Sequence, residues 1–241
     1  MTMTSAAGFP PTRWTLVLQA GQQGDKVADR ALDELCRAYW YPVYAFVRRS
    51  GKTLEEAQDL TQDFFVRFLE RRYVAHADPA KGRFRSFLLV SVKHFLLDQE
   101  GRRFAEKRGG RDRIMALDCI DLERRFGAEL STHETPEAIF DRSWAQSLVA
   151  RVMDDVRDAM DREGQSPLFD QLKPFLPGND ETISYSELAS KLGTTEGALK
   201  VAVHRLRRKY REIFRAEIAH LVSDPGEVDD EVRYLLRALR A

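Results

Sequence analysis

Residues 183–215 read ISYSELASKLGTTEGALKVAVHRLRRKYREIFR, a pattern that predicts two helices joined by a tight turn. Ser184 and Glu187 form a capping box that begins the first helix. Gly193 ends this helix, because glycine readily adopts the positive φ found after a helix C-terminus, and one of the two threonines that follow caps the second helix. Apolar residues then recur at helical spacing: Leu199, Val203, Leu206, Tyr210 and Phe214. A short helix, a glycine turn and a longer helix make a helix-turn-helix.

The second helix of this motif has a basic outer face. At about 100° per residue, His204, Arg205 and Arg208 lie opposite the apolar stripe, together with Val201. Arginine and lysine neutralise DNA phosphates, and residues near the start of a recognition helix reach base edges in the major groove. Val201 suits contact with a thymine methyl, although single exposed valines are also common. A merely solvated basic face is the alternative, and the basic excess of this helix favours DNA binding.

Composition limits the function classes. The 241 residues carry 38 basic and 38 acidic side chains, so the net charge is zero and any DNA binding depends on local patches. No run of residues has the length of a membrane span and the start lacks a signal-peptide pattern, so we expect a cytoplasmic protein. No metal-ligand spacing and no convergent catalytic constellation occur. We therefore predict no metal, no cofactor and no enzyme activity.

The fold class predicted for the whole chain is all-α, because helical spacing recurs throughout and no convincing strand pattern occurs. Pro42 interrupts the pattern of a helix over 27–49, so we expect a kink or break near Trp40. The expected organisation is an N-terminal arm (1–22), a helical domain (23–103), a basic flexible linker (104–135), a helix-turn-helix domain (136–222) and a C-terminal helical extension (223–241).

Two helices of the first domain carry further signals. The stretch KTLEEAQDLTQDFFVRFLERR begins with a capping box, Thr53 and Glu56, and has a charged outer face that is either solvated or bound to a partner. The stretch RFRSFLLVSVKHFLLDQEGRR, residues 83–103, mixes aromatic, aliphatic and basic residues. Single-stranded DNA binding requires this mixture, because bases stack on rings while cations follow the phosphates. A central core helix explains the same stretch equally well.

These segments, in this order, resemble a bacterial RNA polymerase sigma factor of the extracytoplasmic-function (ECF) type, in a long-linker subgroup with an added C-terminal helix. The similarity extends from about residue 28 to 222 and rests on Leu54–Phe68, Phe84–Arg103 and Tyr185–Leu206. It implies a promoter-specificity subunit that binds core RNA polymerase and the −10 and −35 promoter elements, with an anti-sigma factor as a further candidate partner. The alternative is a stand-alone helix-turn-helix regulator, which leaves residues 56–67 and 83–103 unexplained.

The resemblance implies a role for individual residues. It places five residues at the polymerase interface: Asp59, Gln62, Asp63, Phe65 and Arg67. It implies that the melted strand is contacted by Arg85, Lys93, His94, Asp98, Arg102 and Arg103. It implies that the upstream duplex is contacted by Thr195, Lys200, Val201, Ala202, His204, Arg205 and Arg208. Two pairs depart from the family pattern, because many members have Arg-Asn at 93–94 and Ser-Arg at 201–202. We therefore expect altered promoter recognition at these pairs.

Overall fold

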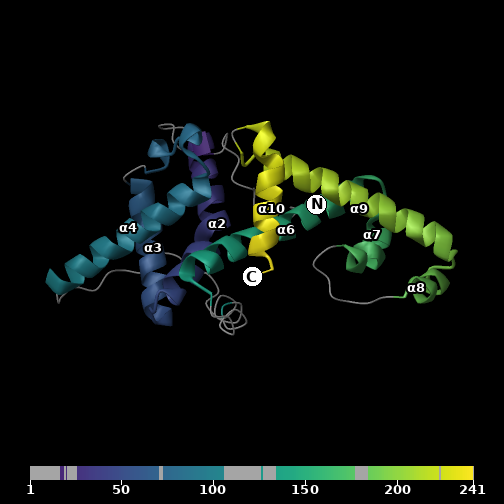
Figure 1. Ribbon diagram of the computed structural model, residues 1–241, viewed down its shortest axis with the longest axis horizontal. Coiled ribbons are helices and arrows are strands. Elements are labelled where there is room, and N and C mark those ends of the chain that lie inside the picture. Colours follow the sequence, from purple (N-terminus) through teal and green to yellow (C-terminus); the bar gives the residue numbers. More distant parts are fainter. Residues whose placement is uncertain are drawn as a thin grey trace. The chain divides into compact units, whose positions relative to one another are not determined.

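The computed structural model describes residues 17–18, 20, 26–70, 73–105, 126, 134–176, 184–222 and 224–240 (Figure 1). All regular elements in these ranges are helical, which confirms the predicted all-α class. The α-helices are α2 (Lys26–Arg49), α3 (Leu54–Glu70), α4 (Phe84–Ala105), α6 (Pro136–Arg162), α7 (Ser166–Leu172), α8 (Tyr185–Lys191), α9 (Glu196–Ala219) and α10 (Val228–Ala238). Short 3₁₀ helices are η1 (Tyr73–His76), η2 (Pro79–Lys81), η3 (Lys173–Phe175) and η4 (Pro225–Glu227).

The described residues form two compact units. Residues 149–218 make up the helix-turn-helix unit, and the described residues before 149 and after 218 make up what we call the α2–α4 unit. The division falls within α6, between Leu148 and Val149, whereas the sequence pattern predicted a domain start at residue 136. The predicted C-terminal extension likewise belongs to the α2–α4 unit through α10. Most of the predicted arm and linker lies outside the described residues.

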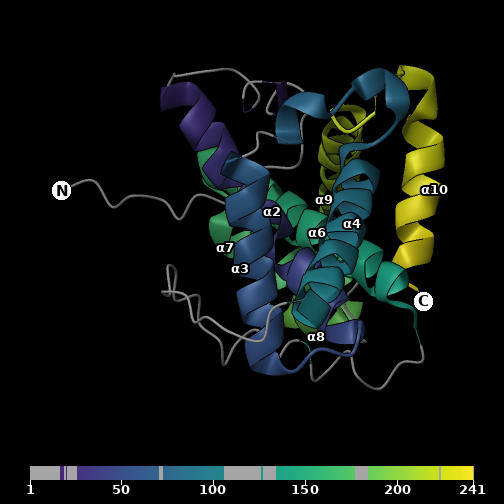
Figure 2. The same ribbon diagram turned by 90° about the vertical axis from the view of Figure 1, so that its left-hand side faces the viewer.

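Aromatic side chains fill the core of the α2–α4 unit. Helix α3 packs against both α2 and α4 (Figure 2). Tyr39 of α2 is almost fully buried, and its ring lies edge-on to Phe84 of α4 at 5.5 Å and stacks on Phe140 of α6 at 6.4 Å. Phe64 of α3 meets Phe95 of α4 edge to face at 5.6 Å. Such pairs stabilise the unit beyond the burial of their area alone.

The sequence predicted a kink or a break near Trp40, and because α2 continues through Pro42 the break does not occur. Proline removes one backbone donor from the helix interior, which weakens the helix locally. The residues on either side of Pro42 are Tyr41 and Val43, and both are buried. Tertiary packing of this segment offsets the local cost, which sequence pattern alone does not reveal.

The helix-turn-helix unit has its own apolar core. The second half of α6 contributes Val152 and Val156, α7 contributes Phe169, and all are at most 1% exposed. The predicted stripe of α9 is buried along its length: Leu199, Val203, Leu206, Tyr210 and Phe214. An ion pair between Arg157 and Asp170, with 3.1 Å between their charged atoms, links α6 to α7.

The caps predicted for these helices are present. Thr53 and Glu56 bond reciprocally at 3.0 and 3.3 Å, which closes the capping box of α3. Ser184 caps α8 by accepting from the amide of Glu187 at 3.5 Å. Gly193 has a φ of 63°, as the turn requires. Of the two candidate threonines, Thr195 caps α9, because its hydroxyl accepts the amide of Ala198 at 3.2 Å.

Candidate nucleic-acid interface

The outer face of α9 is exposed as predicted. Val201 is 51% exposed, and the side chain of Arg208 is 65% exposed. His204 and Arg205 are exposed too, and neither has an ion-pair partner within the part of the chain that the structure describes. The buried stripe described above anchors the opposite side of the same helix, so these side chains project away from the unit. Among the described residues, Arg205 therefore presents positive charge without an ion-pair partner, beside the apolar side chain of Val201.

Lys200 and Arg208 of this face are paired with acidic residues within α9. The Lys200 ammonium lies 2.6 Å from the Glu196 carboxylate, and Arg208 lies 3.6 Å from Glu212. The hydrogen bond from Lys200 to Glu196 raises the pKa of Lys200. Exposed ion pairs at i,i+4 contribute little to stability, so a phosphate can displace either acidic partner.

Other basic residues of α9 hold the helix in place. The guanidinium of Arg207 donates to the carbonyl of Phe175 at 2.9 Å, and the Lys209 ammonium lies 2.5 Å from the Glu163 carboxylate. These contacts connect α9 to η3 and to the end of α6. Helical periodicity alone cannot distinguish a basic residue that packs in this way from one that is presented to solvent.

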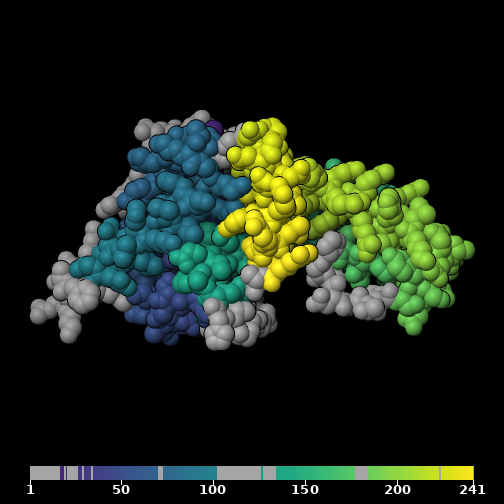
Figure 3. Space-filling model, viewed as in Figure 1, coloured from purple at the N-terminus to yellow at the C-terminus, as the bar shows by residue number. Residues whose placement is uncertain are grey.

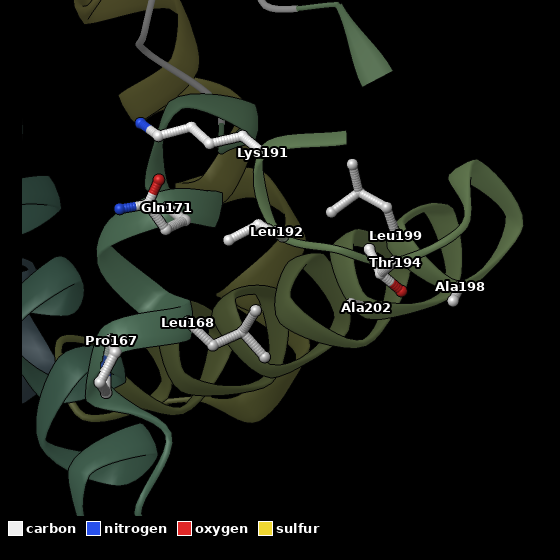
Figure 4. Close-up of a pocket in the computed structure, with 9 residues that line it drawn as sticks. All are labelled: Pro167, Leu168, Gln171, Lys191, Leu192, Thr194, Ala198, Leu199 and Ala202. Atoms are coloured by element: carbon white, nitrogen blue, oxygen red, sulfur yellow. The ribbon is translucent and has the colours of Figure 1, made fainter. Parts of the chain in front are cut away.

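Ala202 occupies a different setting from Val201. It is half-buried and lines an open groove of about 570 Å³ within the helix-turn-helix unit. Figure 4 shows the groove between side chains of α7, such as Leu168, and those of the turn and α9, such as Thr194 and Ala198. The predicted contact of Ala202 with upstream DNA stays a prediction.

Helix α4 has one buried and one exposed face. Leu88 and Val92 are at most 1% exposed, whereas Val90 is 50% and Leu97 is 65% exposed. Val90 and Leu97 are seven residues apart and share a face with His94, which is also exposed. The pattern of this helix was apolar nearly all round, so the sequence did not single out Val90 and Leu97. Only burial separates them from the core residues.

The charged residues predicted on α4 fall into different settings. Asp98 is exposed, and the side chains of Arg102 and Arg103 lie outside the described residues. The Lys93 ammonium lies 2.7 Å from the carboxylate of Glu137 in α6, and each side chain is 42% exposed. The hydrogen bond from Lys93 is the largest cause of the lowered pKa of Glu137.

The prediction for Arg85 is corrected by the structure. Arg85 is 4% exposed and forms a bidentate ion pair with Glu231 of α10, so its guanidinium is not offered to a DNA strand in this fold. The sequence could not indicate this pairing, because the two residues are 146 positions apart. Arg85 therefore acts within the packing of the α2–α4 unit.

Of the five α3 residues predicted at the polymerase interface, four have at least partly exposed side chains and Phe65 does not. Asp59 is exposed, and Gln62 and Asp63 are half-buried on the same side of the helix. Phe65 is 5% exposed and stacks on Trp40 at 5.3 Å, so it supports the core and is removed from the predicted surface.

Two other side chains complete this part of α3. Arg67 is half-buried, with its guanidinium 5.2 Å from the centre of the Phe95 ring. Val66, which the pattern did not single out, is 41% exposed. Val66 follows Asp59 by seven residues, so the two lie on one side of the helix.

Comparison with known proteins shows which proteins this chain is similar to. Residues 35–103 match the family model for sigma-70 region 2, which covers α3, most of α2 and most of α4. The chain is 30% identical over 189 residues to the ECF RNA polymerase sigma factor SigE of Mycolicibacterium smegmatis. The alignment covers 78% of this chain and 63% of that relative, so the chain spans less than two thirds of the relative's length. No solved structure matches.

Residues 35–103 are thus similar to sigma-70 region 2, and 78% of the chain is similar to an ECF sigma factor. The region 2 match falls on the segment that a stand-alone helix-turn-helix regulator leaves unexplained. None of the helices in the described ranges combines the length and the apolar run that crossing a bilayer requires.

Proposed function

We propose that this chain is a promoter-specificity subunit that directs core RNA polymerase to promoters. In this proposal the chain only binds, and the polymerase carries out the catalysis. Both act in the cytoplasm. One observation carries the proposal: a helix-turn-helix, in which His204 and Arg205 are exposed and have no ion-pair partner among the described residues, follows a sigma-70 region 2 on one chain.

The helix-turn-helix unit grips duplex DNA at the upstream element. Arg205 and His204 reach base edges, and Lys200 and Arg208 exchange their intrahelical carboxylates for phosphates. Thr195 adds a capped, positively polarised helix start, which favours a nearby phosphate. Val201 in place of a more polar residue shifts the preferred base towards thymine, whose methyl group it contacts.

The exposed face of α4 captures bases of the melted strand. Val90 and Leu97 offer apolar surface, and His94 offers a ring on which a base stacks. Lys93 and the basic end of the helix follow the phosphates. Capturing unstacked bases offsets the cost of opening the duplex, roughly a few kcal/mol per disrupted step.

The outer face of α3 docks on core polymerase. Asp59, Gln62 and Asp63 supply polar contacts there, and Val66 supplies an apolar centre. Interfaces of this kind combine an apolar core with a polar rim. The basic linker, most of which lies outside the described residues, follows the polymerase channel in this proposal, and an anti-sigma factor is the candidate regulator.

The test is copurification followed by transcription. The chain is mixed with core polymerase and separated by size, and the complex then transcribes a library of promoters. We expect coelution and a sharply defined promoter preference. Asp59→Ala combined with Gln62→Ala removes coelution but leaves the helical content unchanged. Asp158→Ala, an exposed acidic residue of the helix-turn-helix unit, is the control that retains binding. Unaltered coelution of the double variant contradicts the docking face, and absence of coelution for the natural chain contradicts the proposed function.

A further inference from the structure

The helix-turn-helix unit is attached to the α2–α4 unit at both of its ends along the chain. The chain enters it after Leu148, within α6, and leaves it after Ile218, near the end of α9. The segment that follows leads through η4 into α10, which belongs to the α2–α4 unit. The residues after 218 are therefore a second covalent connection between the units.

Helix α10 is firmly docked on its own unit. Leu235 is 1% exposed, Val228 is 8% exposed, and the carboxylate-bearing Glu231 is fully buried. Figure 3 shows the yellow atoms of α10 against the blue atoms of α4 and the teal atoms of α6. A charged side chain is almost never fully buried unless it is paired, so the partners of Glu231 explain why α10 docks here.

The carboxylate of Glu231 is shared by two arginines. Arg85 donates both terminal nitrogens to it, the second at 3.2 Å, and the Nε of Arg83 lies 2.5 Å from Oε2. The Arg85 guanidinium also lies 4.9 Å from the ring centre of Trp144 and 4.5 Å from that of Tyr234. This pairing favours one position of α10, because a shift of the helix by one turn would leave the buried charges of Glu231 and Arg85 without each other as partners.

The connection between the two docked ends is short. Helix α9 ends at Ala219 and η4 begins at Pro225, so residues 220–224 join them. Five residues span at most roughly 17 Å when fully extended. Leu221 and Val222 are buried, so part of this segment is itself packed. The segment 220–224 therefore leaves little free chain length between α9 and η4.

We propose that α10, held by Glu231, is a second tether that restricts the spacer lengths between the two promoter elements that this chain accepts. The inference rests on the proposed function, in which each unit binds one element. In the described residues, the other connection between the units is α6, which runs across the division between Leu148 and Val149. One connection restrains the separation of the units less than two connections do, so a chain without the docked helix tolerates a wider range of separations. The docked helix removes that tolerance.

The experiment measures transcription by the full chain with core polymerase on promoters whose spacer changes by one base pair at a time. The decisive variant carries a Gly/Ser insertion of about twenty residues after Val222, which lengthens the tether flexibly and keeps α10 available to dock. We expect a narrow optimum for the natural chain and a broadened profile for the insertion variant. Glu231→Gln, which weakens docking, broadens the profile in the same direction. The same Gly/Ser segment appended after Ala241 is the matched control and leaves the profile unchanged.

The outcomes separate the tether from a simple brace. A broadened profile for the insertion variant, with unfolding stability equal to that of the natural chain, supports the tether. An insertion profile that matches the natural one overturns it, even if Glu231→Gln loses activity, because α10 then only stabilises its own unit. Absence of promoter-dependent transcription by the natural chain at every spacing overturns the proposed function itself, and this result differs from a retained narrow optimum.

Discussion

Arg85 and Glu231 form a bidentate ion pair between the first turn of α4 and the first turn of α10. The two residues are 146 positions apart in the chain, and their side chains are 4% and 0% exposed. The planar guanidinium matches the two carboxylate oxygens, so the pair sets both the distance and the orientation of α10. The C-terminal segment is therefore a structural part of the α2–α4 unit.

Loss of the Glu231 charge should destabilise this unit. Glu231→Gln keeps the side-chain shape but leaves Arg85 with Asp141 as its remaining acidic neighbour, at 3.5 Å. Breaking a buried pair typically costs about 3–5 kcal/mol, and we expect the lower end because Asp141 remains. Urea unfolding measures the change. Asp230→Asn removes the same charge from an exposed pair with Arg233, and should cost less than about 1 kcal/mol. Equal losses in the two variants would contradict the buried pairing.

Tyr234 should make the unit sensitive to high pH. Burial, and then the hydrogen bond that its hydroxyl donates to Asp141, raise the pKa of Tyr234 from 10.0 to about 12. The folded state thus favours the neutral phenol. Its contribution to stability is complete below pH 10 and is lost as the pH rises through about 12.

The measurement is the urea midpoint across this pH range, together with the absorbance of tyrosinate. Tyr234→Phe should reduce the fall in stability over the window. Tyr73→Phe removes a phenol from the surface of the same unit and should leave the fall intact. An unchanged slope in Tyr234→Phe would show that the Tyr234 phenol does not carry the effect.

Glu137→Gln should strengthen binding of single-stranded DNA. Glu137 lies 2.7 Å from Lys93 and competes with phosphate for that ammonium. Without the carboxylate, the Lys93 ammonium is available to a DNA phosphate. The slope of log affinity against log salt concentration should therefore steepen by roughly 0.7. Fluorescence anisotropy with a labelled oligonucleotide measures both. Glu163→Gln, which frees Lys209 on the helix-turn-helix unit, is the control with the same charge change. A larger effect in the control would argue against strand binding at α4.

Arg205→Ala should weaken binding to the upstream duplex selectively. If Arg205 reads a base, the loss is about 1–3 kcal/mol and discrimination relaxes at one position of the element. Arg211→Ala removes the same charge from an exposed site farther along α9, and should weaken binding to all duplex sequences equally. Competition between matched and mutated duplexes distinguishes the two results. Unchanged discrimination in Arg205→Ala would remove the proposed contact.

Local features were predictable from sequence because they depend on neighbours in the chain. The capping box at Ser184, the positive φ of Gly193 and the buried stripe of α9 are all set within one or two helical turns. The exposure of His204 and Arg205 follows from the same periodicity. Sequence therefore determined the helical class, the helix-turn-helix and most of the candidate surface on α9.

Only the tertiary structure decided which charges and rings face inwards. Arg85 and Phe65 have side chains that suit a binding surface, yet Glu231 and Trp40 bury them. Glu231 stands in an acidic first turn, where a helix favours negative charge in any case, so nothing local marks it as buried. Periodicity indicates which side of a helix is apolar. What packs against that side depends on segments far away in the chain, and here that dependence joins the last helix to α4.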